Sequence, residues 1–263
     1  MTGFMNLSKN LITEKWKLMN LIVGIDLIAL VGIYVLRLIT GGFDGTVMPA
    51  YFLSLFVFSL SLVNMISFIM LSRNNERVFT SNNYRLIPTT DTKLYFSNIL
   101  TTFVAFVYLQ LLEGILGAII YLMSGEGWLN ITTHSAYDGI FALQVLLLAI
   151  LGPILLWSSI TLIHFLINWI GNFLPFGRQK FVIFILYLVV TWIAVLIFNY
   201  VTGLVFKLLY NSGILGISGT LGISNLGQFS GTIWIIVGVV FIWVALFTAV
   251  NIYLLKRWTE TIR

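Results

Sequence analysis

Long apolar runs separated by short polar stretches dominate the pattern along this chain. Six of these runs contain very few charged side chains, and the polar stretches between them reach only about twenty residues. A helix needs roughly 20 apolar residues, at about 1.5 Å rise each, to cross a bilayer. The pattern therefore predicts six membrane-spanning helices, at residues 16–38, 48–71, 94–123, 140–170, 181–206 and 232–255.

The first fifteen residues carry a different pattern. Leu7 and Leu11 lie at helical spacing among polar residues that include Lys9 and Glu14. This arrangement is typical of an amphipathic helix that lies along the membrane interface, and we expect such a helix at residues 1–15. The alternative is a plain extension of the first span into the cytoplasm.

The connection before the last span, residues 207–231, is also unusual. It is apolar, but glycine recurs at every third position from Gly213 to Gly222, which disfavours one long helix. Irregular backbone at membrane depth is tolerated only where protein or a water-filled cavity covers it. We therefore expect an outer re-entrant helical segment buried against other spans, with a flexible glycine-rich loop as the alternative.

The composition agrees with this pattern. Hydrophobic residues make up 59% of the 263-residue chain and charged residues 9%, whereas soluble domains carry roughly 25% charged residues. So many apolar side chains cannot be buried inside one water-soluble core of this size. The sequence predicts an all-α integral membrane protein in which residues 1–263 form a single transmembrane domain.

The distribution of basic residues predicts the orientation. Of the 14 lysine and arginine residues, all but Arg37 and Lys207 fall near the termini or in the loops at 72–93 and 171–180. Lysine and arginine are enriched in the cytoplasmic loops of membrane proteins. We therefore expect both termini and the 72–93 hairpin to be cytoplasmic.

Ionisable side chains inside the predicted spans are candidates for function, because each costs about 2.5 to 3.5 kcal/mol at the centre of an inserted helix. Asp26 comes near mid-membrane and should face protein instead of lipid. Glu113 comes near the outer end of its span. We expect it to form an outer ion cluster with Arg37 and Lys207.

His164 and Asn168 are four residues apart on the fourth span, so they share one helix face. They form either a hydrogen-bonded packing pair or a proton relay or substrate contact. We predict no metal site, because His134 and His164 fall near opposite membrane faces, and the chain has no cysteine. Without a nucleophile motif such as G-x-S-x-G, we expect no catalytic residues and no enzyme activity.

The polar segment 72–93, SRNNERVFTSNNYRLIPTTDTK, is the largest predicted cytoplasmic element. Asn75 is a suitable N-cap for a short helix that continues to Phe79. Pro88 should end any helix that precedes it, and the residues that follow should cap the third span. The chain contains no G-x-x-x-x-G-K-[ST] sequence, so it cannot bind nucleotide phosphates through a P-loop. If ATP drives its function, the ATPase is another polypeptide.

The stretch ERVFTSNNYRLIPTTDTKLYFSNIL, residues 76–100, is similar to the corresponding part of small Gram-positive bacterial permeases that pair with a separate ATPase. The order of elements along the whole chain also resembles the membrane subunit of type-2 ATP-binding-cassette exporters. The resemblance implies that the hairpin contains the coupling helix that docks into the ATPase. The residues that it assigns to this role are Glu76, Arg77, Val78, Phe79, Tyr84, Arg85 and Pro88.

The same resemblance implies a complex of two permease subunits, identical or different, with two ATPases in the bacterial cell membrane. ATP is then bound by the partner, so the chain itself holds no cofactor, and nucleic acid is not among its partners. The Phe-rich faces of the second and fifth spans favour a hydrophobic or amphipathic cargo, such as a peptide, a drug or a lipid. Two other readings stay open: an ion-coupled secondary transporter, and a membrane immunity or structural partner protein.

Overall fold

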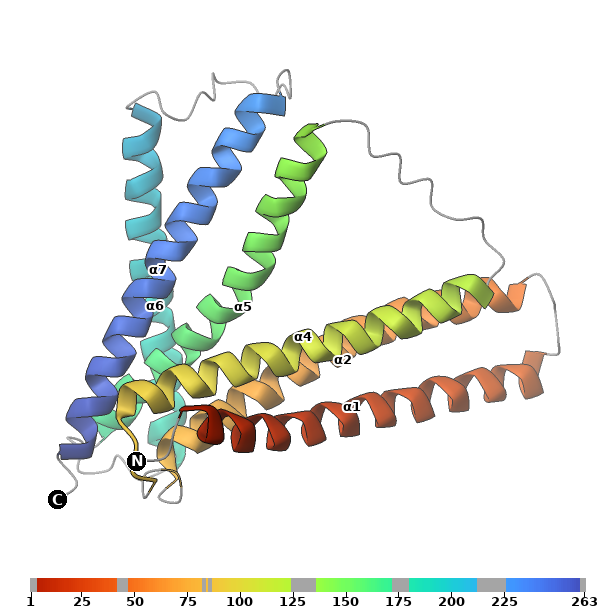
Figure 1. Cartoon of the computed structure of the whole chain (residues 1–263), viewed down its shortest axis with the longest axis horizontal. Helices are drawn as coiled ribbons and strands as arrows, with labels where there is room; N and C mark the ends of the chain where they lie inside the picture. Colours follow the sequence, from red (N-terminus) through yellow and green to blue (C-terminus); the bar gives the residue numbers. More distant parts are fainter. Residues whose placement is uncertain are drawn as a thin grey trace. The chain divides into compact units, whose positions relative to one another are not determined.

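The computed structural model describes residues 4–41, 47–81, 84, 87–123, 136–171, 180–211 and 226–260. Within these residues the only regular secondary structure is helix, and there is no strand. All six long helices are apolar enough to cross a membrane, which confirms the predicted all-α, multi-pass membrane architecture. In chain order they are α1 (Phe4–Gly41), α2 (Val47–Thr80), α4 (Asp91–Met123), α5 (Ala136–Gly171), α6 (Lys180–Asn211) and α7 (Leu226–Glu260) (Figure 1).

Each helix is longer than the predicted span that it contains. The lengths run from 32 to 38 residues, which corresponds to roughly 48 to 57 Å. The hydrocarbon core of a bilayer is only about 30 Å thick. The helices therefore continue past the hydrocarbon core at one or both ends, where their backbone bonds remain satisfied within the helix.

At the start of the chain, the predicted interfacial helix is not a separate element. The helix α1 runs without a break from Phe4 to Gly41, so residues 4–15 are the first turns of the first spanning helix and do not form a separate interfacial helix. Leu7 and Leu11 are buried inside the protein, because the apolar stripe that suggested an interface helix packs against α2 and α4. The plain extension of the first span is the arrangement observed.

The predicted re-entrant segment falls mainly outside the described residues. Its first residues, from Lys207, continue α6 to Asn211, and its last residues belong to α7, which begins at Leu226. Residues 212–225 lie outside the described part of the chain.

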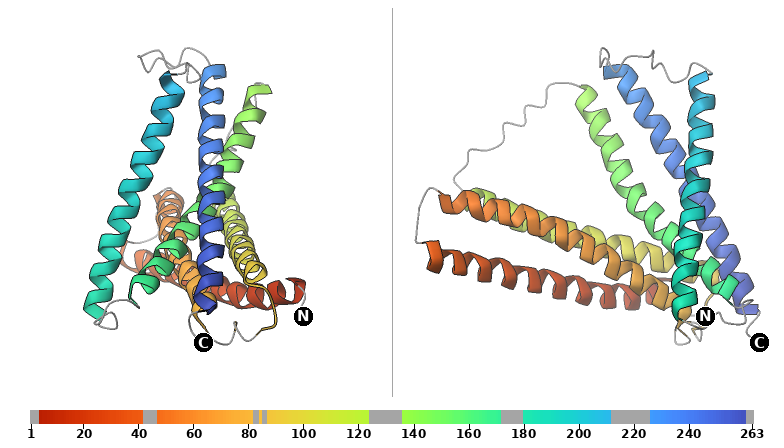
Figure 2. Two further views of the ribbon diagram at one scale, coloured as in Figure 1. Left: turned by 90° about the vertical axis from the view of Figure 1, so that its left-hand side faces the viewer. Right: turned by 180° about the vertical axis from the view of Figure 1, so that it is seen from behind.

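The chain divides into two compact units, Met1–Ile131 and Thr132–Arg263. In the first unit, α1, α2 and α4 pack against one another in all three pairs, and the right-hand view of Figure 2 shows α2 and α4 side by side. Two apolar clusters lie at different levels of this unit. One contains Leu7, Leu11, Val78 and Leu94; the other contains Leu30, Phe56 and Ile120. The polar side chains between these clusters form the sites described below.

In the second unit, α5 packs against both α6 and α7. The helices α6 and α7 are also in contact. The Trp243 indole N–H of α7 donates a hydrogen bond to Thr202 Oγ1 of α6 over 3.2 Å. The Trp243 ring also lies 4.9 Å from the Phe198 ring, centroid to centroid. Aromatic pairs at this separation stabilise helix packing beyond the area that they bury.

Candidate functional site

The predicted coupling hairpin begins as a continuation of α2. This helix extends to Thr80, so Asn75 lies inside the helix, near its C-terminal end, and the prediction that it is an N-cap is wrong. α4 begins at Asp91, and the backbone N–H of Lys93 donates to Thr90 Oγ1 over 3.4 Å. A threonine therefore caps the third span, as its sequence position suggested.

Two apolar residues of the hairpin are buried in this chain's own core. Val78 is 1% exposed and Phe79 is 0% exposed. Val78 packs with Leu7, Leu11 and Leu94, and the Phe79 ring stacks on Tyr95 at a centroid distance of 5.6 Å. The prediction that these two side chains dock into a groove on a partner does not fit their burial, because docking would require them to leave this core.

Most of the exposed side chains among the described residues of the hairpin are polar or basic. Arg73, Arg77 and Thr80 are exposed at helical spacing on one face of α2, and Pro88 and Lys93 are exposed just beyond it. Of the other residues predicted for coupling, Glu76 is partly buried, and Arg85 lies outside the described residues. The surface that this hairpin offers to a partner is therefore a ridge of guanidinium groups, with no aromatic anchor among these exposed residues.

Tyr84 ties the hairpin to the first helix. Its hydroxyl donates to Glu14 Oε2 over 2.6 Å. Burial, with this hydrogen bond as the second cause, raises the pKa of Tyr84 from its ordinary value of 10.0 to about 12. The raised pKa extends the pH range in which the phenol is protonated and can donate to Glu14.

A buried lysine lies directly beneath the hairpin. Lys15 of α1 is 0% exposed, and its ammonium group is surrounded by oxygen atoms from α2 and α4. The closest are Thr102 Oγ1 at 2.6 Å, Asn98 Oδ1 at 2.7 Å and the Asn98 carbonyl at 2.8 Å. Thr101 Oγ1 follows at 3.0 Å and Asn75 Oδ1 at 3.3 Å. We call Lys15 and these four residues the lysine nest.

The lysine nest joins all three helices of the first unit. Asn75 Oδ1 also accepts from Thr102 Oγ1 over 2.5 Å, and Asn98 Nδ2 donates to the Asn75 carbonyl over 3.3 Å. All five acceptors of the Lys15 ammonium are neutral oxygens. Sequence reasoning missed this site, although one signal pointed to it: Lys15 continues the buried stripe formed by Leu7 and Leu11 at four-residue spacing.

The two predicted intramembrane acids of the first unit both face neighbouring helices. Asp26 Oδ1 accepts from Ser59 Oγ of α2 over 2.5 Å. Glu113 is 5% exposed, and its Oε2 accepts from Asn64 Nδ2 of α2 over 2.8 Å. Asn64 also accepts a hydrogen bond from Gln110 of α4. These polar side chains connect α1, α2 and α4 between the two apolar clusters.

The predicted outer ion cluster is not assembled within the first unit. The Arg37 guanidinium lies over the Tyr51 ring, 5.6 Å from its centroid, whereas Glu113 faces Asn64. The described residues of this unit contain no ion pair between Arg37 and Glu113. Lys207 belongs to α6 in the second unit, so its place in such a cluster stays a prediction.

His164 and Asn168 are hydrogen-bonded in the second unit. Asn168 Nδ2 lies 2.8 Å from His164 Nε2, and His164 Nδ1 lies 2.7 Å from the Tyr187 hydroxyl of α6. With the amide donating, Nε2 is the acceptor and Nδ1 carries the proton toward Tyr187. The contact to Tyr187 links α5 to α6, as a packing pair would, and the proton relay or substrate contact stays a prediction.

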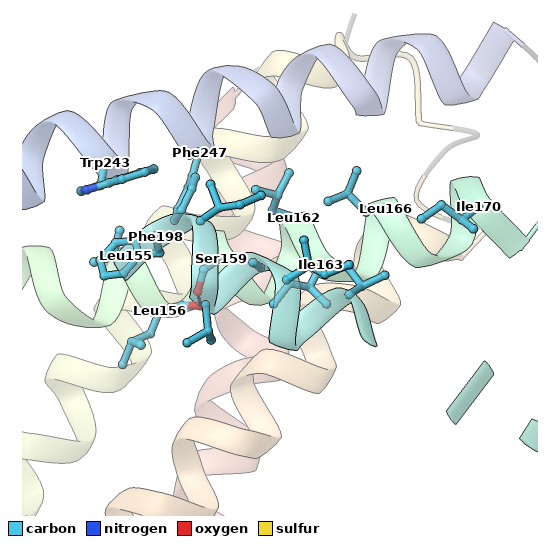
Figure 3. Close-up of a pocket in the computed structure, with 15 residues that line it drawn as sticks. Leu155, Leu156, Ser159, Leu162, Ile163, Leu166, Ile170, Phe198, Trp243 and Phe247 are labelled. Atoms are coloured by element: carbon cyan, nitrogen blue, oxygen red, sulfur yellow. Dashed lines mark hydrogen bonds between the residues drawn. The ribbon is translucent and has the colours of Figure 1, made fainter. Parts of the chain in front are cut away.

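An apolar cleft of about 520 Å³ lies among α5, α6 and α7. Its lining is almost entirely hydrocarbon and aromatic, and Ser159 supplies the hydroxyl group in the wall. Figure 3 shows Leu155 and Leu162 of α5 on one side of the cleft and Trp243 and Phe247 of α7 on another. A cleft with this lining suits an alkyl chain or a ring and offers little to a sugar.

The described residues contain no group of three or more His, Cys, Asp or Glu side chains that could hold a metal ion. Comparison with protein-family models, with curated proteins and with solved structures finds no match to this chain.

Proposed function

We propose that this chain is the permease subunit of an ATP-binding-cassette exporter in a bacterial cell membrane. ATP is hydrolysed by a separate ATPase, and a second permease subunit completes the transport path. Both termini and the 72–93 hairpin face the cytoplasm in this proposal. The permease contributes no catalytic residue and no nucleotide site of its own.

The observation that carries the proposal is the attachment of the hairpin to all three helices of the first unit. Phe79 is inserted against Tyr95 of α4, and Tyr84 is bonded to Glu14 of α1. Asn75 belongs to the lysine nest one turn below. A push on the exposed end of α2 would therefore move α1, α2 and α4 together, because interlocked cores and hydrogen-bonded networks shift between discrete arrangements.

The burial of Val78 and Phe79 changes which residues of the hairpin contact the ATPase in this proposal. The contact surface is the exposed basic ridge of Arg73 and Arg77 together with Pro88 at the turn. Guanidinium groups form paired hydrogen bonds with carboxylates, so the matching surface on the ATPase should be acidic. Val78 and Phe79 then support the coupling helix from behind.

The cargo in this proposal is hydrophobic or amphipathic. The cleft among α5, α6 and α7 supports this class, because its lining would leave the hydroxyl groups of a sugar chain without partners. An acyl chain or an apolar peptide side chain buries comparable surface without that cost.

The test is affinity purification of the full chain from its native membrane, followed by an ATPase assay. We expect a non-membrane ATPase to be recovered with the wild type and to be lost with the double variant R73A/R77A. The matched control is K9A/K17A, which removes the same charge from exposed positions on α1 and should retain the ATPase. Recovery of no ATPase with the wild type would contradict the proposal, as would equal recovery with both double variants.

An ion-coupled secondary transporter is the second candidate function. The specific observation in its favour is that the first unit contains two carboxyl groups within its spanning helices, Asp26 and Glu113, and that both accept hydrogen bonds from α2, since intramembrane carboxyl groups commonly mark ion pathways. Transport by purified protein that is driven by an ion gradient, without ATP, would favour this candidate over the exporter.

A further inference from the structure

The apolar cleft of the second unit extends along one half of its spanning helices. One end lies at Phe198 and Trp243, near the middle of α6 and of α7. The other end lies at Ile170, close to the end of α5, and Figure 3 shows Leu166 and Ile170 on the side of the cleft away from Trp243. From Leu155 to Ile170 the cleft follows α5 for about fifteen residues, or roughly 22 Å. Because the hydrocarbon core of a bilayer is about 30 Å thick, a cleft of this length reaches from mid-membrane to one membrane face.

The two ends of the cleft differ in polarity. At mid-membrane the lining is aromatic, and the Trp243 ring lies 4.9 Å from the Phe198 ring and 5.2 Å from the Phe247 ring, centroid to centroid. The other end is level with the polar ends of α5 and α6. His164 lies seven residues before the end of α5, and it is hydrogen-bonded to Tyr187, which lies seven residues after the start of α6. An amphipathic molecule in the cleft would therefore place its apolar end at the aromatic rings and its polar end at this membrane face.

The polar side chains of the lining already have hydrogen-bond partners within the protein. Ser159 Oγ donates to the Leu156 carbonyl over 2.8 Å, and the Trp243 indole N–H donates to Thr202 Oγ1 over 3.2 Å. An extended peptide would bury N–H and C=O groups here without partners, which is costly in an apolar environment. An alkyl chain has no polar group to satisfy, so the lining favours an alkyl chain over a peptide.

The volume of the cleft also limits its occupant. It measures about 520 Å³, within the roughly 300 to 1,000 Å³ of small-molecule sites. A helix of about 10 Å diameter would need on the order of 1,700 Å³ over the same length. A helix of another protein or of a second copy could therefore cover the cleft but could not enter it, whereas a single alkyl chain can lie along it.

We propose that this cleft binds one acyl chain of a membrane phospholipid. The end of the chain lies against Trp243 at mid-membrane, and the head group lies at the membrane face where α5 ends and α6 begins. Lys180 is exposed at the start of α6, which favours a phospholipid with an anionic head group. The site goes beyond the proposed export function and is independent of it, because the binding needs neither ATP nor an ATPase.

Photo-crosslinking of the full chain tests the proposal. The protein is purified in a maltoside detergent and titrated with phosphatidylglycerol that carries a diazirine at the end of one acyl chain, and the adducts are mapped by peptide mass spectrometry. We expect the adduct on Trp243 to saturate. The adduct on Phe241, which is 60% exposed on the same helix, should instead rise in proportion to the added lipid. With the diazirine moved beside the ester group, the adduct should move from Trp243 to Ile170.

Two variants that fill the cleft complete the test. The A194F and L166W variants place a ring at two positions of the lining, and each should lower the adduct on Trp243 about tenfold, which corresponds to about 1.4 kcal/mol of binding free energy. The matched control is A245F, at an exposed position on α7, which should keep the adduct. In every variant, the size-exclusion elution volume and the adduct on Phe241 should equal those of the wild type.

Three results would overturn the proposal. The first is an adduct on Trp243 of the wild type that is absent or rises in proportion to lipid, as on Phe241. The second is an adduct on Trp243 that both cleft-filling variants leave unchanged, or that A245F lowers as much as they do. The third is an adduct that stays on Trp243 when the diazirine is beside the ester group, since the chain would then lie in the opposite direction.

Discussion

Replacement of Lys15 by methionine tests whether the lysine nest holds the first unit together. Methionine has nearly the same length and shape as lysine, so it removes the charge and its hydrogen bonds without opening a large cavity. The ammonium group has three hydrogens to share among the five surrounding oxygens. The variant therefore removes up to three charge-assisted hydrogen bonds at once.

The expected loss follows from the oxygens that remain. Thr102 still donates to Asn75 Oδ1, and Thr101 still donates to the Ser97 carbonyl, so these groups keep a partner. Asn98 Oδ1 loses the one donor that contacts it, and an unsatisfied buried acceptor costs about 1 to 3 kcal/mol. We expect the free energy of unfolding to fall by about 2 kcal/mol, which lowers the melting temperature by roughly 4 to 8 °C in a domain of this size.

The assay is thermal unfolding in detergent, followed by the loss of the monodisperse size-exclusion peak. The control is K17M, the same substitution two residues further along α1 at an exposed position, which should change stability by less than about 0.5 kcal/mol. A Lys15→Met variant as stable as K17M, or more stable than the wild type, would refute the reasoning. That result would mean that the desolvation cost of the buried ammonium exceeds what its hydrogen bonds return.

Three further predictions concern packing and pH. The Gly117→Ala variant should be about 1 kcal/mol less stable than the Gly114→Ala variant. A Cβ at position 117 would lie 3.1 Å from the Phe56 ring, whereas a Cβ at position 114 would meet nothing within 4 Å. Equal melting temperatures of the two variants would contradict this prediction. Phe79→Ala should cost about 3 to 5 kcal/mol, whereas the half-exposed Phe96→Ala should cost far less in the same thermal assay. The raised pKa of Tyr84 favours its protonated form in the folded state. The stability that this phenol contributes is therefore complete below pH 10.0 and is lost as pH rises toward about 12. Melting temperatures measured across that range should fall more steeply for the wild type than for the Tyr84→Phe variant.

The number of helices and their type could be predicted from hydropathy alone, because a bilayer allows few alternatives to a continuous helix for a long apolar run. The helix ends could not, since they lie in polar sequence where caps and tertiary contacts decide. Asn75 illustrates this point. Its residue type favours an N-cap, but its side chain is needed in the lysine nest, so α2 continues through it to Thr80.

Only part of the candidate site could be predicted from the sequence, because many of its contacts come from other helices. Charge at membrane depth identified Asp26 and Glu113 as polar residues that need protein neighbours, but the partners Ser59 and Asn64 come from another helix and carry no charge of their own. The sequence predicts only a topological role for the charge of Lys15, because a single sequence gives no sign that α2 and α4 supply five neutral oxygens around it. The apolar side chains of Val78 and Phe79 fit a partner's groove and this chain's own core equally well, so their sequence alone does not distinguish docking from burial.

The two polar layers of the first unit decide how α1 can move. In lipid, apolar side chains gain little by leaving lipid tails for another helix, so hydrogen bonds and close packing fix how helices pair. Most of the polar bonds that hold α1 come from the lysine nest and from Asp26 with Ser59, about eleven residues apart. A shift of α1 by one helical turn would leave the ammonium and the Asp26 carboxylate beside apolar surface at the same time, each at a cost of several kcal/mol. A slide of α1 by a whole turn is therefore strongly disfavoured relative to the observed register.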